Sequence, residues 1–203
     1  MSKLLVFGAS ITWGAFDLEY GGWVERLKTH FLRNYKEKGI GVYNFAVSDN
    51  NTRGILEFLE HDIKKITRIE SEELNLIFSL GSNDSRHNKE NQIKVPIDEY
   101  EKNIKEIIKI GKNNSKRIIV IGPAKINESL TNPWEDSGEY WKNENIEKYN
   151  QIVEKVCKEE QIEFISLINE IKESELHDGL HPNTQGHEKI FKKVKNSLQT
   201  KTF

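Results

Sequence analysis

Short apolar runs alternate along the chain with longer segments in which apolar residues recur every three or four positions. The short runs are rich in leucine and β-branched residues, the composition and length typical of strands buried on both faces of a sheet. They cover residues 3–8, 41–47, 74–81, 116–122 and 162–168. The sequence therefore predicts five buried strands.

The longer segments have the spacing of helices with one apolar face. Three lie between the strands and carry Val24, Leu27, Phe31, Leu32 and Tyr35, then Tyr100, Ile104, Ile107 and Ile108, then Ile146, Tyr149, Val153, Val156 and Cys157. A terminal helix is predicted from Ile190, Phe191, Val194 and Leu198. Asp98, with Glu101 three residues on, is typical of a helix start, and Gly111 of a helix end.

Strands that alternate with helices need crossover connections, which favour a parallel sheet covered on both faces. The predicted fold class is therefore α/β, as a three-layer α/β/α, doubly wound sheet of five parallel strands. A chain of 203 residues without repeats or linkers is expected to form one domain over residues 1–203. The least patterned segment, 122–143, is predicted to be a long loop over one edge of the sheet.

Charge and composition restrict the possible partners. Lys and Arg number 30 and Asp and Glu 32, so the net charge of −2 provides no broad basic surface for nucleic acid. No segment has the signature of a signal peptide or approaches the ~20 apolar residues of a membrane span. One cysteine, Cys157, cannot form an internal disulfide, which is typical of a reducing compartment. We expect a cytoplasmic protein that acts on a small molecule.

Polar residues follow three of the predicted strands, where doubly wound proteins bind their ligands. The first strand is followed by Ser10, the second by Asp49, and the third by Asn83 within the sequence GSND. Since the carboxyl ends of parallel strands meet at one edge, we expect these residues to lie close together. Ser10 taken alone favours a helix cap or turn residue over a nucleophile, because serine favours such positions.

A late motif, HDGLHPN, supplies a possible partner for Ser10. Asp178 and His181 are three residues apart, a spacing that brings side chains together within one helical turn. The carboxylate would orient the imidazole, which would remove the proton of the serine hydroxyl. The Asn83 amide and the backbone N–H groups of Ser10 and Asp49 are candidate donors to an oxyanion. His177 is a rival general base.

At this point the sequence resembles the SGNH or GDSL hydrolases over nearly its whole length. The family's four blocks occur in order as FGASITWG, NFAVSDNNTRG, GSND and DGLHPN. The resemblance implies a flavodoxin-like sheet and a nucleophile at Ser10, with Asp178 and His181 completing the triad. It also implies an oxyanion hole formed by Ser10, Asn83 and the backbone at Asp49, and chemistry without a metal or cofactor.

Two residues depart from the family pattern. Ala9 replaces the usual acidic residue before the nucleophile, and Asp49 replaces the usual glycine of the second block. A carboxylate close to an oxyanion would oppose its charge, although Asp tolerates left-handed backbone geometry and its carboxylate can point away. The predicted function is a serine esterase or acyl hydrolase that cleaves a small or carbohydrate-borne ester through an acyl-enzyme. The alternative is a binding module of the same fold with little or no turnover.

Other residues of the sequence have weaker signals of function. Trp13 and Trp134 are predicted to lie near the substrate, since both follow strand ends. Cys157 lies on the apolar face of its helix and is expected to be a core residue. His187 is expected to be solvated on the terminal helix, and His30, His61 and His87 lack the spacing of metal ligands. A nucleotide-binding domain is disfavoured because the first loop lacks a glycine-rich phosphate motif. Neither the oligomeric state nor the natural substrate can be derived from the sequence.

Overall fold

The computed structural model describes residues 2–33, 36, 39–67, 73–135 and 137–200. Its main sheet has five parallel strands in the order β2-β1-β3-β5-β7. They are β1 (Ser2–Phe7), β2 (Ile40–Asn44), β3 (Glu73–Ser79), β5 (Arg117–Ala124) and β7 (Glu163–Leu167). Numbered among themselves, these strands have the flavodoxin-like order 2-1-3-4-5. The predicted strands and fold class are thus confirmed.

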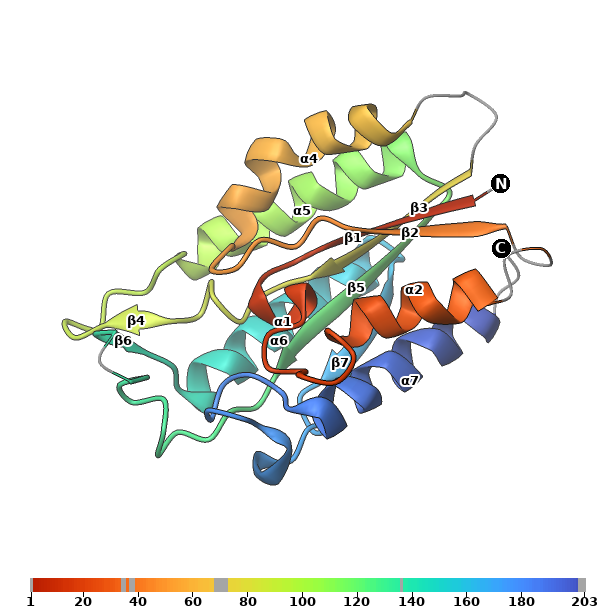
Figure 1. The fold of residues 1–203 in the computed structure, drawn as a ribbon. Coiled ribbons are helices and arrows are strands. Elements are labelled where there is room, and N and C mark those ends of the chain that lie inside the picture. The colour runs from red at the N-terminus through yellow and green to blue at the C-terminus, as the bar shows by residue number, and fades with distance from the viewer. Residues whose placement is uncertain (1, 34–35, 37–38, 68–72, 136, 201–203) are drawn as a thin grey trace.

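Helices cover both faces of this sheet (Figure 1). On one face lie α4 (Thr52–Ile66), α5 (Ile97–Asn114) and α6 (Asn143–Glu159), and on the other α2 (Trp23–Arg33) and α7 (Thr184–Thr200). Each crossover between neighbouring parallel strands therefore carries a helix to one face or the other. This arrangement is the predicted three-layer architecture.

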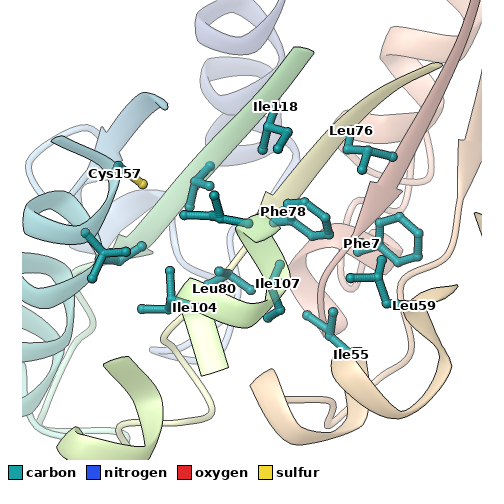
Figure 2. Close-up of a cluster of buried hydrophobic side chains, with 14 of the residues drawn as sticks. Phe7, Ile55, Leu59, Leu76, Phe78, Leu80, Ile104, Ile107, Ile118 and Cys157 are labelled. Atoms are coloured by element: carbon teal, nitrogen blue, oxygen red, sulfur yellow. The ribbon is translucent and has the colours of Figure 1, made fainter. Parts of the chain in front are cut away.

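Side chains of each strand alternate between two hydrophobic cores, as the two-residue period of a strand requires. On β1, Leu5 and Phe7 pack toward α4 and α5, whereas Leu4 and Val6 pack toward α2 and α7. Figure 2 shows the first of these cores, where Phe7 stacks on Phe78 with ring centroids 5.4 Å apart. Burial on both faces explains why the strands appear in the sequence as continuous apolar runs.

The smaller elements gather at the carboxyl end of the sheet (Figure 1). Helix α1 (Ser10–Trp13) follows β1, the 3-10 helix η1 spans Glu173–Glu175, and β4 (His87–Asn88) pairs antiparallel with β6 (Glu139–Tyr140). The predicted long loop 122–143 is only partly correct. Its first residues complete β5, and β6 joins its last part to β4 in a two-stranded ribbon.

The structure corrects three local predictions. Helix α4 was not predicted, and helix α5 begins at Ile97 after Pro96, so Asp98 lies inside its first turn and does not cap it. Helix α5 also continues past Gly111 to Asn114. A Cβ at Gly111 would lie 2.7 Å from Cδ1 of Ile118. Glycine therefore serves the close packing of α5 on β5 and does not end the helix.

His187 is fully buried, contrary to the prediction that it is solvated. Its Nδ1 accepts a hydrogen bond from the Trp23 N–H at 3.3 Å, and its Nε2 lies 2.9 Å from the Ala15 carbonyl oxygen. These partners require a neutral ring with the proton on Nε2. Burial lowers the pKa of His187, and the bond to Ala15 only partly opposes this effect. The residue joins α7 to the segment that follows α1.

No helix in the ranges that the structure describes is long and apolar enough to cross a bilayer.

Candidate active site

Ser10, His181 and Asp178 form one chain of hydrogen bonds at the carboxyl end of the sheet. Ser10 is the first residue of α1, shortly after β1 ends at Phe7, and its Oγ lies 2.8 Å from Nε2 of His181. On the other side of the ring, Nδ1 lies 2.7 Å from Oδ2 of Asp178. The side chains of His181 and Asp178 are 7% and 9% exposed. The structure thus brings together three residues selected from the sequence, two of them 171 positions apart.

A turn, and not a helix, holds Asp178 beside His181. Residues 177–181 have no helical structure, and Gly179 adopts a left-handed φ of 88°. Oδ1 of Asp178 accepts the backbone N–H groups of Leu180 at 3.0 Å and His181 at 2.7 Å. This Asx turn leaves Oδ2 for the imidazole. The sequence prediction had the correct pair but the wrong local structure.

The environment of Asp178 keeps its carboxyl group ionised. Burial by itself would raise the pKa of this group, but the hydrogen bonds from the His181 ring and from two backbone N–H groups outweigh it. The pKa falls to about 2. A permanently charged acceptor holds the proton of His181 on Nδ1, so that Nε2 faces Ser10 as an acceptor.

Three hydrogen-bond donors lie near Ser10. The Asn83 side chain is buried and donates from Nδ2 to the Asn50 carbonyl at 2.9 Å, which leaves its second N–H for another acceptor. The backbone N–H groups of Ser10 and Asp49 donate to no acceptor within the described part of the chain. Ser10, Asp49 and Asn83 all line one cavity of about 290 Å³, here called the outer cavity.

Asp49 has the left-handed backbone that the sequence analysis allowed, with φ of 67°. Its carboxylate forms an ion pair with Arg86, in which Nη1 contacts Oδ1 and Nη2 lies 3.3 Å from Oδ2. Nη1 of Arg86 also donates to Oε2 of Glu139 at 2.7 Å. The guanidinium of Arg86 therefore balances the charge of the carboxylate at position 49. The sequence did not predict this partner.

Sequence reasoning missed Arg86 and Glu139 as site residues. Both line the outer cavity with Ser10. Arg86 follows the GSND block by two residues, which was the one available signal that it lies near the site. Glu139 is 53 positions further on, and only the pairing of β4 with β6 brings it close.

The two tryptophans predicted near the substrate have different positions. Trp134 lines the outer cavity, and its ring meets that of His181 edge to face with centroids 5.7 Å apart. Trp13 is 59% exposed and lines neither the outer cavity nor a second, smaller cavity beside Ser10. Phe16, which was not predicted to be a site residue, also contacts His181, with ring centroids 5.2 Å apart.

The second cavity, called the inner cavity here, has a volume of about 40 Å³. Ser10, Asn83 and Leu180 line both cavities, so the two adjoin at the serine. The other residues of the inner cavity include Ile55, Leu80 and Ala124, and most of the lining is apolar. The serine thus lies between a small apolar space and a larger polar one.

The remaining candidates lie away from this chain. His177 is exposed and stacks on Phe16 with centroids 4.4 Å apart, and the chain of bonds to Ser10 runs through His181. Cys157 is buried in the core shown in Figure 2, and burial raises its pKa to about 12. Within the described ranges, no cluster of three or more His, Cys, Asp or Glu side chains has the arrangement of a metal site.

The sheet order and the elements that carry the site define a protein of the SGNH hydrolase fold. The chain belongs to the GDSL-like lipase/acylhydrolase family, whose profile matches residues 4–194. The resemblance drawn from the four sequence blocks is thereby confirmed. The protein is an enzyme, an ester hydrolase of the GDSL type.

Similar proteins of known sequence or structure agree with this family. The chain is 27% identical to an isoamyl acetate-hydrolyzing esterase of Saccharomyces cerevisiae, over 93% of this chain and 82% of that protein. It is 21% identical to the solved structure of an acetylxylan esterase from Geobacillus stearothermophilus, with a TM-score of 0.73 and coverage of 97% and 93%. An alpha/beta hydrolase from the metagenome of Lake Arreo, Spain, matches with a TM-score of 0.73, 20% identity and coverage of 97% and 94%.

Proposed function

We propose that the protein is a serine esterase that cleaves small carboxylic esters through an acyl-enzyme at Ser10. The observation that carries this proposal is the chain of hydrogen bonds from Ser10 Oγ through His181 to Asp178, at 2.8 and 2.7 Å. The first distance allows proton transfer from Ser10 to His181, and the second bond, on the opposite nitrogen of the imidazole, orients the ring.

In the proposed reaction His181 acts first as a base and then as an acid. Nε2 takes the Ser10 proton while Oγ attacks the ester carbonyl carbon, and Asp178 stabilises the imidazolium that forms. The same proton passes to the leaving alcohol oxygen as the carbon–oxygen bond breaks. Water then attacks the acyl-enzyme with His181 again as the base, which releases the acid and restores Ser10.

The negative oxygen of the tetrahedral intermediate needs donors that are already in place. We assign this role to the N–H groups of Ser10 and Asp49 and to the second N–H of Asn83. The bond from Asn83 to the Asn50 carbonyl supports the assignment, because it fixes the orientation of the amide next to the turn that carries Asp49.

The two cavities suggest how the ester lies. The inner cavity, at about 40 Å³, is much smaller than the outer one and mostly apolar, so we assign to it a short acyl group such as acetyl. The outer cavity of about 290 Å³ suits the alcohol part, with Trp134 as one wall. The acetate named for the yeast relative and the acetylxylan named for the solved structure are in keeping with a short acyl group.

The alternative of a binding module without turnover rested on the charge of Asp49. Arg86 contacts both oxygens of that carboxylate, which removes the main argument for an impaired oxyanion hole. Ala9, the other departure, provides no side-chain cap to α1, yet Ser10 lies within hydrogen-bond distance of His181. No observation favours the binding module over the enzyme.

One experiment tests the proposal and its alternative together. We expect p-nitrophenyl acetate to be hydrolysed faster than the butyrate and hexanoate esters, and an organophosphate to label Ser10. Ser10→Ala should lose almost all turnover and all labelling while circular dichroism stays unchanged, because the hydroxyl contributes little to packing. Turnover near the wild-type rate in Ser10→Ala would exclude the nucleophile. Absence of both turnover and adduct in the wild type would favour the binding module.

A further inference from the structure

Arg86 is a buried cation between two carboxylates beside the candidate oxyanion hole. Its side chain is 4% exposed, whereas that of Asp49 is 69% exposed and that of Glu139 34%. The guanidinium also lies over the Trp141 ring, 5.7 Å from its centroid, and Trp141 is itself buried. Burial restricts the rotamers of such an arginine more than those of an arginine in a surface ion pair.

The turn that presents the N–H of Asp49 is held at several points. The Asn50 N–H donates to the Val47 carbonyl at 3.1 Å, and the Asn50 carbonyl accepts from Asn83. Asp49 lies between these bonds with a positive φ, a conformation that most residues adopt rarely. Arg86 is the partner that the structure shows for its side chain, and it comes from the same segment as Asn83. The segment that carries Asn83 therefore also holds, through Arg86, the turn that carries the N–H of Asp49.

Arg86 also affects the charge of the site. An unpaired carboxylate at position 49 would repel the oxyanion that the backbone N–H of the same residue is proposed to stabilise. Arg86 lines the outer cavity together with Asp49 and Ser10, so its positive charge lies at the cavity in which the reaction is proposed to occur. Arg86 thus offsets the carboxylate that replaces the neutral glycine of the family pattern, and with Glu139 the three side chains carry a net charge of −1.

Glu139 links Arg86 to the loop that carries Trp134, which lines the outer cavity. Its bond to Arg86 joins β6 to the segment that ends in β4, and the two strands pair Asn88 with Glu139. The carbonyl of Glu139 accepts the backbone N–H of Trp134 at 2.9 Å. Trp134 in turn contacts the His181 ring. One guanidinium thus connects the turn at Asp49 with the loop that carries Trp134.

We propose that Arg86 is a positioning residue for ester hydrolysis. It fixes the turn so that the N–H of Asp49 points at the oxyanion, and it neutralises the Asp49 carboxylate in the transition state. This inference rests on the proposed function, because it assumes that the oxyanion forms next to Ser10.

The test measures kcat and KM for p-nitrophenyl acetate in Arg86→Gln, Asp49→Asn and the double variant. Arg86→Gln should lower kcat by about tenfold to a hundredfold and change KM by less than about threefold, because the lost stabilisation belongs to the transition state. Asp49→Asn keeps the backbone N–H, and its amide oxygen still accepts from Arg86, so it should lower kcat less than Arg86→Gln does. The double variant should recover part of the loss, because the carboxylate that Arg86 neutralises is absent, whereas the contact that fixes the turn is still missing.

Two controls separate this role from a structural one. Arg53→Gln removes an arginine that also pairs with a carboxylate, that of Glu99, but on the exposed surface of α4 and outside both cavities, and it should keep the wild-type kcat. Arg86→Lys retains the charge without the bidentate contact and should fall between the wild type and Arg86→Gln. If Arg86→Gln does not fold, Arg86→Lys is compared with and without Asp49→Asn in the same way.

The outcomes decide between the two proposals. Labelling of wild-type Ser10 by an organophosphate is measured first, and its absence contradicts the proposed function itself. If Ser10 is labelled, a wild-type kcat in Arg86→Gln overturns the role of Arg86. The same conclusion follows if the losses in Arg86→Gln and Asp49→Asn simply multiply in the double variant, since independent effects show no coupling.

Discussion

At the scale of single residues, the Asx turn of Asp178 explains how a short, non-helical segment orients the imidazole that we propose as the general base. One carboxylate oxygen organises the backbone and the other faces Nδ1 of His181. Because the pKa of Asp178 is lowered to about 2, this carboxylate stays charged at the pH values at which a histidine side chain gains or loses a proton. The pH dependence of turnover should therefore arise from the imidazole and not from its acidic partner.

We predict that kcat/KM for p-nitrophenyl acetate, measured between about pH 5 and pH 9, rises with pH because the base must be neutral to accept the serine proton. His181→Ala should lower the rate by about a thousandfold or more and abolish this rise. Initial rates across that pH range provide the measurement.

His177→Ala is the matched control, since His177 is four residues away and exposed. It should keep both the rate and the pH profile. The reverse result, in which His177→Ala abolishes the rise and His181→Ala does not, would show that His177 is the base.

The residues of the site differ in how far the sequence predicts them. Ser10, Asn83, Asp178 and His181 each stand in a short motif at a strand end or in the last block, and the structure brings all four together. Arg86 and Glu139 stand in no motif, and their ion pair depends on the path of two loops. Single-sequence patterns record the periodicity of regular elements, so contacts between loops stay outside their reach.

At the scale of elements, helix α7 does more than cover the sheet. His187, on its first turn, binds the backbone of Trp23 at the start of α2 and of Ala15 just after α1. The N–H of Ala15 donates to the carbonyl of Ser10 at 3.0 Å. A buried neutral histidine thus joins three helices around the residue proposed as nucleophile.

We predict that this histidine makes the protein less stable at mildly acidic pH. The pKa of His187 in the folded state lies below its ordinary value of 6.5, so the unfolded chain binds more protons. The stabilisation is complete above pH 6.5 and is lost as the pH falls below it. His187→Gln keeps a donor and an acceptor but does not titrate. Its midpoint in urea should therefore change less than that of the wild type between about pH 7.5 and pH 5.5.

His61→Gln is the control for this comparison, because His61 is exposed on α4. It should show the wild-type dependence of stability on pH. An unchanged dependence in His187→Gln would mean that other groups cause the loss at acidic pH.

Most of the helices could be predicted from the helical spacing of their apolar residues, with one exception. The helices α2, α5, α6 and α7 were found from their apolar faces, but α4 was missed although Ile55, Leu59 and Ile63 recur every four residues. The burial of His187 was also missed, because a histidine beside an apolar face has no signal that distinguishes solvent from a neighbouring loop. Tertiary contacts decide such positions.

At the scale of the whole molecule, the site depends on both ends of the chain. Ser10 follows the first strand and His181 precedes the last helix, with 171 positions between them. The four sequence blocks indicated the flavodoxin-like order, whereas the apolar runs alone indicated only parallel strands. That residues 1–203 form one domain stays a prediction, and it has a measurable consequence.

If the chain is one cooperative domain, activity, secondary structure and core burial should be lost together in urea. Cys157 is a suitable reporter of the core, because it is the one cysteine of the sequence, is fully buried, and has its pKa raised to about 12. A thiol reagent should therefore modify it only after the core opens. We expect the midpoints of esterase activity, far-ultraviolet circular dichroism and Cys157 modification to coincide. Activity that disappears at clearly lower urea than the other two signals would show that the site opens separately from the core.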